Sequence, residues 1–398
     1  MTRQPAGPET CDPRWRGAAF ALPFAVGLAV VGCTSGSDAG EEEDAAAQLA
    51  SWVGPAPAGD WTGATDVQAF PDEPRFRRLT KLTNAGTNAE AYFSAEGDRL
   101  VFQATWPGVS ECDQMYTMAL DGSDLQRVST GQGRTTCGFF FPGQDILLFS
   151  STHLSGPACP PAPDRSRGYV WGLFEYDIFT RNVRTGEVQQ LTNSPGYDAE
   201  GTLSPDGSQI VFTSTRSGDL DIWLMNGDGS NPRQLTSDVG YEGGPVFSWD
   251  GTKIVYRASR PETPEEIASY QALLAEDLVA GSALEIFVMD VDGSNKRQVT
   301  SNGAANFAPG FLPDGRRIIY SSNQGDPSGR TFALYLINED GTGEERVTTS
   351  EAPTFNSFPM LSPDGRYLAF SSDRGAVGPG EINVFLAEWV DPLPAGAP

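Results

Sequence analysis

The sequence predicts an all-β fold, a six-bladed β-propeller of four-stranded blades with one inserted helix. Three observations lead to this prediction. A turn motif close to Ser-Pro-Asp-Gly recurs six times, a short β-branched and aromatic run follows each copy, and Asp-Gly-type hairpin signals recur between the copies. The 398 residues include 45 glycines and 30 prolines, a composition typical of many turns.

The turn motif marks the hairpin between the first and second strands of each predicted blade. In five copies the glycine takes the same place, and in the second it comes one position early; the six are Gly97, Gly143, Gly207, Gly251, Gly315 and Gly365. In the third blade, runs at 210–215 and 221–226 precede an Asp-Gly pair and a last run at 233–237. Asp-Gly suits a tight hairpin because glycine accepts positive φ without steric cost.

The sixth unit lacks an outer-strand pattern after residues 383–390. Residues 77–83, which come before the first unit, match that pattern. We therefore expect the N-terminal strand to complete the last blade and close the ring. A seventh unit with the turn motif is not found.

The sequence before the repeats has the features of a signal for export and of a site for attachment to a membrane. Residues 1–32 have the pattern of a signal peptide, with Arg14 and Arg16 before an uncharged stretch, and Val30-Val31-Gly32-Cys33 resembles the bacterial lipobox. We expect Cys33 to be lipidated, residues 33–74 to form a flexible tether, 75–391 the propeller and 392–398 a tail. The alternative is an ordinary signal peptide with a chance cysteine.

The net charge of the chain limits the classes of molecule that it can bind. The chain carries a formal charge of −25, so it repels nucleic acid and anionic membranes. We expect a monomer that meets the membrane through its lipid anchor only, in the bacterial envelope, as a periplasmic or outer-membrane lipoprotein.

The six units resemble the propeller repeats of the TolB family of bacterial envelope proteins. The resemblance covers roughly residues 75–390 and rests on the repeated turn, hairpin and strand pattern described above. It implies the propeller fold and a place in the envelope. TolB carries an α/β domain before its propeller, for which residues 34–74 are too few, so the resemblance is confined to the propeller.

Two intervals between turn glycines are 64 residues long, against 44 to 50 for the others. The excess predicts insertions in blades two and four, both between the second and third strands and therefore on one face of the ring. The second insertion begins with a capping box at Thr263-Pro264-Glu265-Glu266 and predicts a helix of about four turns ending at Gly281, its apolar stripe including Leu278. Loops of this kind commonly carry function.

Polar residues recur at one position of the first strands, on the same face. Radial symmetry predicts a ring of them around the channel mouth, with Glu90 and Glu200 beneath it; a cation, a basic or polar peptide, or a sugar would suit this site. The ring consists of Asn88, Thr135, Asp198, Glu242, Asn306 and Asn356.

The sequence contains little that indicates catalysis or metal binding. The sequence has no G-x-S-x-G motif and one histidine, His153, and its Asp-Gly loops lack the spacing of a calcium loop. Cys112, Cys137 and Cys159 allow one disulfide with three pairings. We expect no catalytic residue, no metal site and no cofactor, although a cation in the channel is possible.

We therefore interpret the chain as a non-enzymatic scaffold that binds an envelope protein or peptide. The alternative is a protein that binds a small ligand, cation or glycan, or a carboxylate-based enzyme acting on glycans, at the acidic channel mouth.

Overall fold

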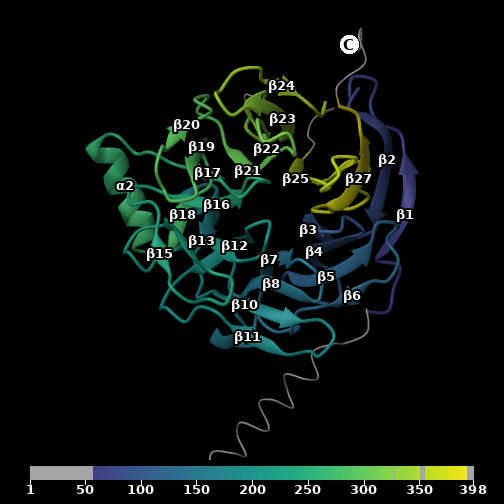
Figure 1. Ribbon diagram of the computed structural model, residues 1–398, viewed down its shortest axis with the longest axis horizontal. Coiled ribbons are helices and arrows are strands. Elements are labelled where there is room, and N and C mark those ends of the chain that lie inside the picture. The colour runs from purple at the N-terminus through teal and green to yellow at the C-terminus, as the bar shows by residue number, and fades with distance from the viewer. Residues whose placement is uncertain (1–56, 327, 350–354, 392–398) are drawn as a thin grey trace, which may run out of the picture. The chain divides into compact units, whose positions relative to one another are not determined.

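The computed structural model describes residues 57–391, except for 327 and 350–354. These residues form six antiparallel sheets arranged around a central axis, which confirms the predicted six-bladed propeller (Figure 1). The predicted signal peptide and Cys33 lie outside the described residues. Among the residues described, no helix is long and apolar enough to cross a membrane.

The blades follow one another along the chain. Blade 1 comprises β3 (Thr87–Phe93), β4 (Arg99–Thr105), β5 (Gln114–Ala119) and β6 (Gln126–Arg127). Blade 2 comprises β7 (Thr135–Phe140), β8 (Ile146–Ser151), β10 (Asp177–Asn182) and β11 (Val188–Gln190). Blade 3 comprises β12 (Asp198–Leu203), β13 (Gln209–Ser214), β14 (Asp221–Asn226) and β15 (Arg233–Gln234).

The second half of the ring repeats this order. Blade 4 comprises β16 (Glu242–Phe247), β17 (Lys253–Ala258), β19 (Glu285–Asp290) and β20 (Arg297–Gln298). Blade 5 comprises β21 (Asn306–Phe311), β22 (Arg317–Ser322), β23 (Ala333–Asn338) and β24 (Glu345–Arg346). Blade 6 comprises β25 (Asn356–Leu361), β26 (Tyr367–Ser372), β27 (Asn383–Trp389), β2 (Phe76–Thr83) and β1 (Thr62–Val67).

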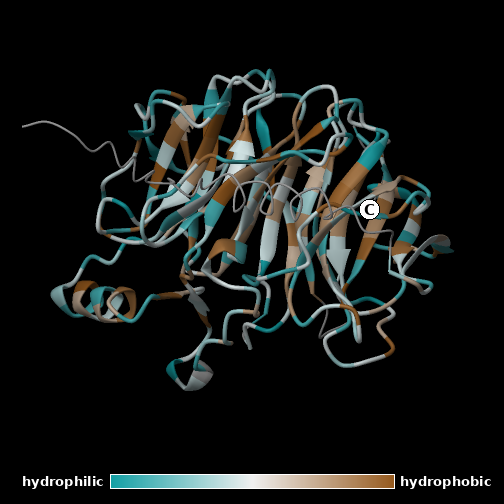
Figure 2. Ribbon diagram, turned by 90° about the horizontal axis from the view of Figure 1, so that it is seen from below, coloured by the Kyte–Doolittle hydropathy of each residue, from teal (hydrophilic) through white to brown (hydrophobic). Residues whose placement is uncertain are grey.

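The core lies between the blades rather than inside any one of them. Six clusters of buried apolar side chains each join two neighbouring blades, one at every boundary of the ring. The second and third strands supply most of them, because their two faces pack against different neighbours. Leu148 of β8, for example, packs toward blade 3 and Phe149 toward blade 1. Figure 2 shows these hydrophobic residues concentrated in the strands.

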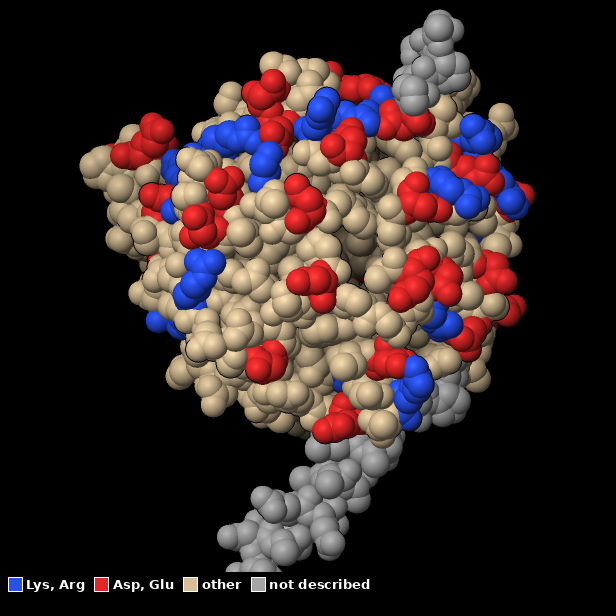
Figure 3. All heavy atoms as spheres, viewed as in Figure 1, with Lys and Arg blue, Asp and Glu red and all other residues tan. Residues whose placement is uncertain are grey.

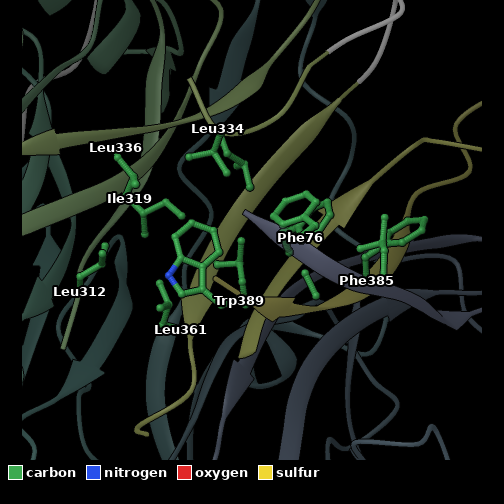
Figure 4. Close-up of a cluster of buried hydrophobic side chains, with 13 residues drawn as sticks. Phe76, Leu312, Ile319, Leu334, Leu336, Leu361, Phe385 and Trp389 are labelled. Carbon is green, nitrogen blue, oxygen red and sulfur yellow. The ribbon is translucent and has the colours of Figure 1, made fainter. Parts of the chain in front are cut away.

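The predicted closure by the N-terminal strand is confirmed. Strand β2 pairs antiparallel with β27, the last strand of the ring, with Leu79 opposite Ala387. Around this junction Phe76 and Trp389 meet apolar side chains of blade 5 such as Leu334 (Figure 4). The two ends of the propeller are therefore held in one sheet and one cluster.

The turn motif has the same hydrogen bonds in blades 3, 4 and 6. In blade 3 the Asp206 carboxylate accepts from the Ser208 backbone N–H at 3.0 Å and from the Ser204 hydroxyl at 2.7 Å. The Ser204 oxygen in turn accepts from the Gln209 N–H at 2.9 Å. Gly207 has φ of +72°, which explains the glycine. Ser248 and Asp250 repeat these contacts in blade 4, and Ser362 and Asp364 repeat them in blade 6.

The two insertions meet each other. Helix α2 (Pro264–Leu274) begins at the predicted capping box and lies outside the blades in Figure 2. It is shorter than predicted, since Leu278 belongs to β18 (Leu278–Ala280) and not to the helix. Strand β18 pairs with β9 (Val170–Gly172) from the blade 2 insertion. We call this two-stranded sheet the cap.

The blade 2 insertion is also tied to blade 1. It carries two short 3-10 turns, η1 (His153–Ser155) and η2 (Arg165–Arg167). A disulfide joins Cys159 in this insertion to Cys112, which precedes β5. This pairing selects one of the three that the sequence allowed and leaves Cys137 as a free thiol.

One difference from the expected organisation lies before the propeller. Residues 62–67 fall within the expected tether, yet they form β1 and pair with β2 as a fifth strand of blade 6. Trp61 stacks on Trp106 of blade 1 with ring centroids 5.2 Å apart. Some residues before position 75 are therefore part of the folded ring.

Removing apolar contacts at the closure should lower stability. Leu79 is 1% exposed in the cluster of Figure 4, so Leu79→Ala should lower the free energy of unfolding by about 3 kcal/mol, measured by urea denaturation. The matched control is Arg77→Ala, an exposed residue of the same strand, which should change it by less than about 0.5 kcal/mol. Equal effects would show that β2 does not close the ring.

A central cavity as the candidate functional site

Every first strand has an irregularity at the same place. Its pairing with the second strand shifts register, and one residue there adopts a left-handed conformation with φ between +45° and +58°. This arrangement is a β-bulge, which re-aims a side chain. The six bulge residues are Glu90, Cys137, Glu200, Gly244, Ala308 and Phe358. Five of them are not glycine, so each holds a conformation that L-residues rarely adopt.

All six bulge residues line one cavity on the propeller axis, with a volume of about 590 Å³. Viewed along this axis, the surface is hollowed near the centre of the ring (Figure 3). Residues two places further along each first strand also line it: Tyr92, Phe139, Thr202, Val246, Gly310 and Met360. The bulges therefore determine which side chains face the cavity.

The cavity wall is unequal around the ring. Blades 1 to 3 contribute the polar bulge residues Glu90, Cys137 and Glu200. Blades 4 to 6 contribute apolar or small ones, with prolines beside them at 245, 309 and 359. One side can therefore bind polar or charged groups and the other apolar groups.

Glu200 is held by a dense set of donors. Its carboxylate accepts from the Thr213 hydroxyl and the Gly244 N–H, both at 2.8 Å, and pairs with the Arg257 guanidinium. Burial alone would lower the pKa of Arg257, but Tyr241 and Glu200 outweigh it and raise that pKa. A Cβ at position 244 would lie 2.8 Å from Arg257 Nη1, so a larger residue there would displace the guanidinium from its place beside Glu200.

Glu90 lacks such compensation. Among the described residues no ion pair to Glu90 is found, and its hydrogen-bond donor is the Cys137 thiol. Burial raises the pKa of Glu90 to about 7, the Cys137 thiol and Arg257 oppose this rise, and Glu200 adds to it. Burial and the same two carboxylates raise the pKa of Cys137 well above its usual range. The cavity thus holds one carboxylate without a cation.

The cap contributes aromatic side chains to the cavity wall. Trp171 of β9 lies 5.9 Å from Tyr241 and 5.4 Å from Phe307, measured between ring centroids. The Arg257 guanidinium lies 5.2 Å from the centroid of the Trp171 ring. Together they form a cation–π and carboxylate cluster at one side of the cavity.

The predicted polar ring exists but does not face the cavity. Its members are at most 1% exposed, and each backbone N–H donates, at 2.9 to 3.2 Å, to the residue just before the third strand of the preceding blade. We call these contacts the seam. The donors Asn88, Thr135, Asp198, Glu242, Asn306 and Asn356 meet the carbonyls of Ile382, Asp113, Tyr176, Leu220, Leu284 and Phe332.

The side chains of the seam have local partners, although Glu242 Oε2 is buried without a hydrogen bond. Asn88 and Asn306 donate to the same carbonyls as their backbones, at 2.8 and 2.7 Å, as Asn356 does at 3.1 Å. Asp198 pairs with Arg216 and Glu242 with Arg260. Of the predicted ligand-binding residues, Glu90 and Glu200 line the cavity, whereas the seam residues join blades.

Sequence reasoning missed Arg257 and the aromatic residues of the cavity. A signal for Arg257 was available, because it is the one charged residue inside the apolar runs of the six second strands. His153 is buried, donates to or accepts from the Ser151 hydroxyl at 2.9 Å, and has its pKa lowered by burial to about 4. Within the described ranges, no group of three acidic, histidine or cysteine side chains could hold a metal ion.

Glu90 should reduce stability at alkaline pH. Its pKa is higher in the folded chain than unfolded, so protonation favours folding, and this contribution is lost as pH rises through about 7. Glu90→Gln should therefore stabilise the protein at pH 8 by about 1 to 3 kcal/mol, and the difference should vanish near pH 4. Urea denaturation across this range measures it; a difference independent of pH would contradict the burial of an uncompensated charge.

Comparisons with known proteins agree with this architecture. A family model described as TolB beta propeller domain matches residues 174–273. The Tol-Pal system protein TolB of Francisella tularensis is 37% identical over 99 residues, 24% of this chain and 21% of that protein. The protein of the same name from Wolinella succinogenes is 26% identical over 234 residues, 57% and 49% of the two chains. The matches thus span about half or less of these relatives.

Solved structures give the same result for the fold. TolB from Acinetobacter baumannii superposes with a TM-score of 0.50 and 16% identity, covering 78% of this chain and 68% of that one. A putative TolB from Agrobacterium tumefaciens gives 0.52 and 17%, covering 83% and 100%. The chain therefore contains a TolB-like β-propeller, as its repeats predicted.

Proposed function

We propose that this protein is a non-enzymatic scaffold of the bacterial cell envelope that takes a segment of a partner protein or peptide into its central cavity. The observation that carries the proposal is the cavity itself, built from all six blades with one polar and one apolar side. Its volume of about 590 Å³ suits a few side chains rather than a folded domain. Similarity to the Tol-Pal system protein TolB supports an envelope role.

The arrangement of polar groups favours binding over catalysis. Glu200 is engaged by Arg257, and the Cys137 thiol has a raised pKa, so it is a poor nucleophile. The sulfur of Cys159, which shares its loop with His153, is taken up by the disulfide. The second candidate is a small-ligand binder, favoured by the uncompensated Glu90 carboxylate in the same cavity.

Filling the cavity should abolish capture of the partner. Gly310 lines the cavity, and a Cβ there would meet only Pro359 O at 3.9 Å, so Gly310→Trp can be accommodated and its ring would occupy the space of the guest. In pull-downs from envelope extracts with the purified protein, we expect the variant to lose the partner that the unmodified protein captures.

The matched control places the same side chain elsewhere. Gly378 also has open space around its Cβ position but does not line the cavity, so Gly378→Trp should capture the partner normally. Retention of the partner by Gly310→Trp would overturn the proposal. Binding of a sugar or other small molecule, detected as a thermal shift that Gly310→Trp removes, would favour the second candidate.

We further propose that Cys33 is acylated and anchors the protein to a membrane. The proposal rests on the Val30-Val31-Gly32-Cys33 pattern and the uncharged stretch before it. Cys33→Ser should move the protein from the membrane fraction to the soluble fraction, as followed by immunoblotting of fractionated cells. Cys137→Ser is the control and should leave the distribution unchanged, and unaltered membrane partitioning of Cys33→Ser would refute the anchor.

A further inference from the structure

We propose that Glu90 binds the guanidinium group of an arginine side chain in the peptide that enters the cavity, with an apolar neighbour of that arginine packing on the apolar wall that blades 5 and 6 form. This inference rests on the proposed function and names the chemistry of its guest. It is carried by the charge balance, the ring systems and the two unequal sides of the cavity.

The charge balance calls for one cation. The charged side chains lining the cavity are Glu90, Glu200 and Arg257, so two carboxylates face one guanidinium. Arg257 is committed to Glu200 and to Tyr241, whose hydroxyl accepts from Arg257 Nε at 2.9 Å. A guest cation at Glu90 would neutralise the remaining charge in a setting where water screens it poorly.

Aromatic rings beside Glu90 favour arginine over lysine. Tyr92 lines the cavity and feels the charge of Glu90, and its ring stacks on that of Phe139 with centroids 4.4 Å apart. A guanidinium is planar, stacks on aromatic faces and meets a carboxylate through two parallel N–H donors. A lysine ammonium makes neither the stack nor the paired contact.

The cavity already contains one example of this arrangement. Arg257 pairs with Glu200 while its guanidinium lies 5.2 Å from the Trp171 centroid, 5.6 Å from that of Tyr241 and 5.9 Å from that of Phe307. Glu90 occupies the equivalent bulge position two blades earlier. Glu90 provides the carboxylate and the rings beside it provide the stacking surface, so the guest would supply the guanidinium.

The apolar wall next to Glu90 determines the rest of the guest. Phe358, Met360 and Ala308 line the cavity from blades 5 and 6, together with Pro309 and Pro359. These side chains offer no charge and favour an apolar or aromatic residue. A peptide with an arginine next to such a residue would contact both walls at once.

The test uses the purified full chain and three isosteric probes that combine a ring with different charges: benzamidine, benzamide and benzoate. By isothermal titration calorimetry at pH 8, we expect benzamidine to bind at least tenfold more tightly than benzamide, and benzoate to bind more weakly than either. Glu90→Gln should reduce the affinity for benzamidine to that for benzamide. Glu187→Gln, at an exposed hairpin, should leave it unchanged.

The affinity of the unmodified protein for benzamidine should fall as pH drops below about 7, where Glu90 becomes protonated. The other ionisable groups acting on Glu90 are Cys137, Glu200, Arg257 and Asp113. The Glu90→Gln variant should show no such fall.

Equal affinities for benzamidine and benzamide, no binding of benzamidine at millimolar concentration, or unchanged binding by Glu90→Gln would each overturn the inference. The proposed function fails separately. If Gly310→Trp loses the envelope partner while Glu90→Gln retains it, the cavity binds a protein segment but not through an arginine. If both variants retain the partner, the cavity is not its binding site.

Discussion

One backbone hydrogen bond, repeated at each blade boundary, sets the geometry on which the rest depends. In the seam, a backbone N–H at the first or second residue of each first strand donates to the carbonyl of the residue before the third strand of the preceding blade. The last of these bonds, from Asn88 N–H to Ile382 O at 2.9 Å, joins the first and sixth blades and acts with β2 to close the ring. Apolar packing stabilises the blades, and this bond fixes where each first strand begins.

The position of the cavity follows from the seam, because the bulge residues that line it come shortly after the seam residues along each first strand. Each bulge comes two positions after a seam residue, so six side chains reach the axis at one level. Left-handed backbone at a non-glycine residue is costly and persists where its surroundings hold it. Because the seam and the second strand hold both ends, the chain can place Glu90 and Glu200 here while keeping glycine beside Arg257. The repeat thus determines where side chains enter the cavity, and the residue types at these positions make its two sides different.

Most of the fold could be predicted from local patterns in the sequence. Turn glycines, hairpin signals and the strand at 77–83 predicted six blades and their closure, since each acts within one repeat. The sequence placed Glu90 and Glu200 at equivalent positions, and both line the cavity. It assigned the seam residues to the channel mouth because polarity at a strand end looks alike whether water or a neighbouring blade satisfies it.

Contacts between the two insertions, which lie far apart in the chain, could not be predicted from a local sequence pattern. The pairing of β9 with β18 joins segments about a hundred residues apart, and the helical spacing of Leu278 masked a strand. Arg257 stood out in its apolar run, but its partner Glu200 lies in another blade.

Strand β1 has a consequence for how copies of this protein meet one another. The outer strands of blades 1 to 5 are two or three residues long, too short to template pairing with another chain, whereas β2 spans eight residues. Without β1 that long edge would present a row of free N–H and C=O groups, an invitation to self-association. The irregular register of β1 and the charged Asp66 on it make the new edge a poor template. A segment expected to form a tether thus covers the long outer edge of the blade that closes the ring.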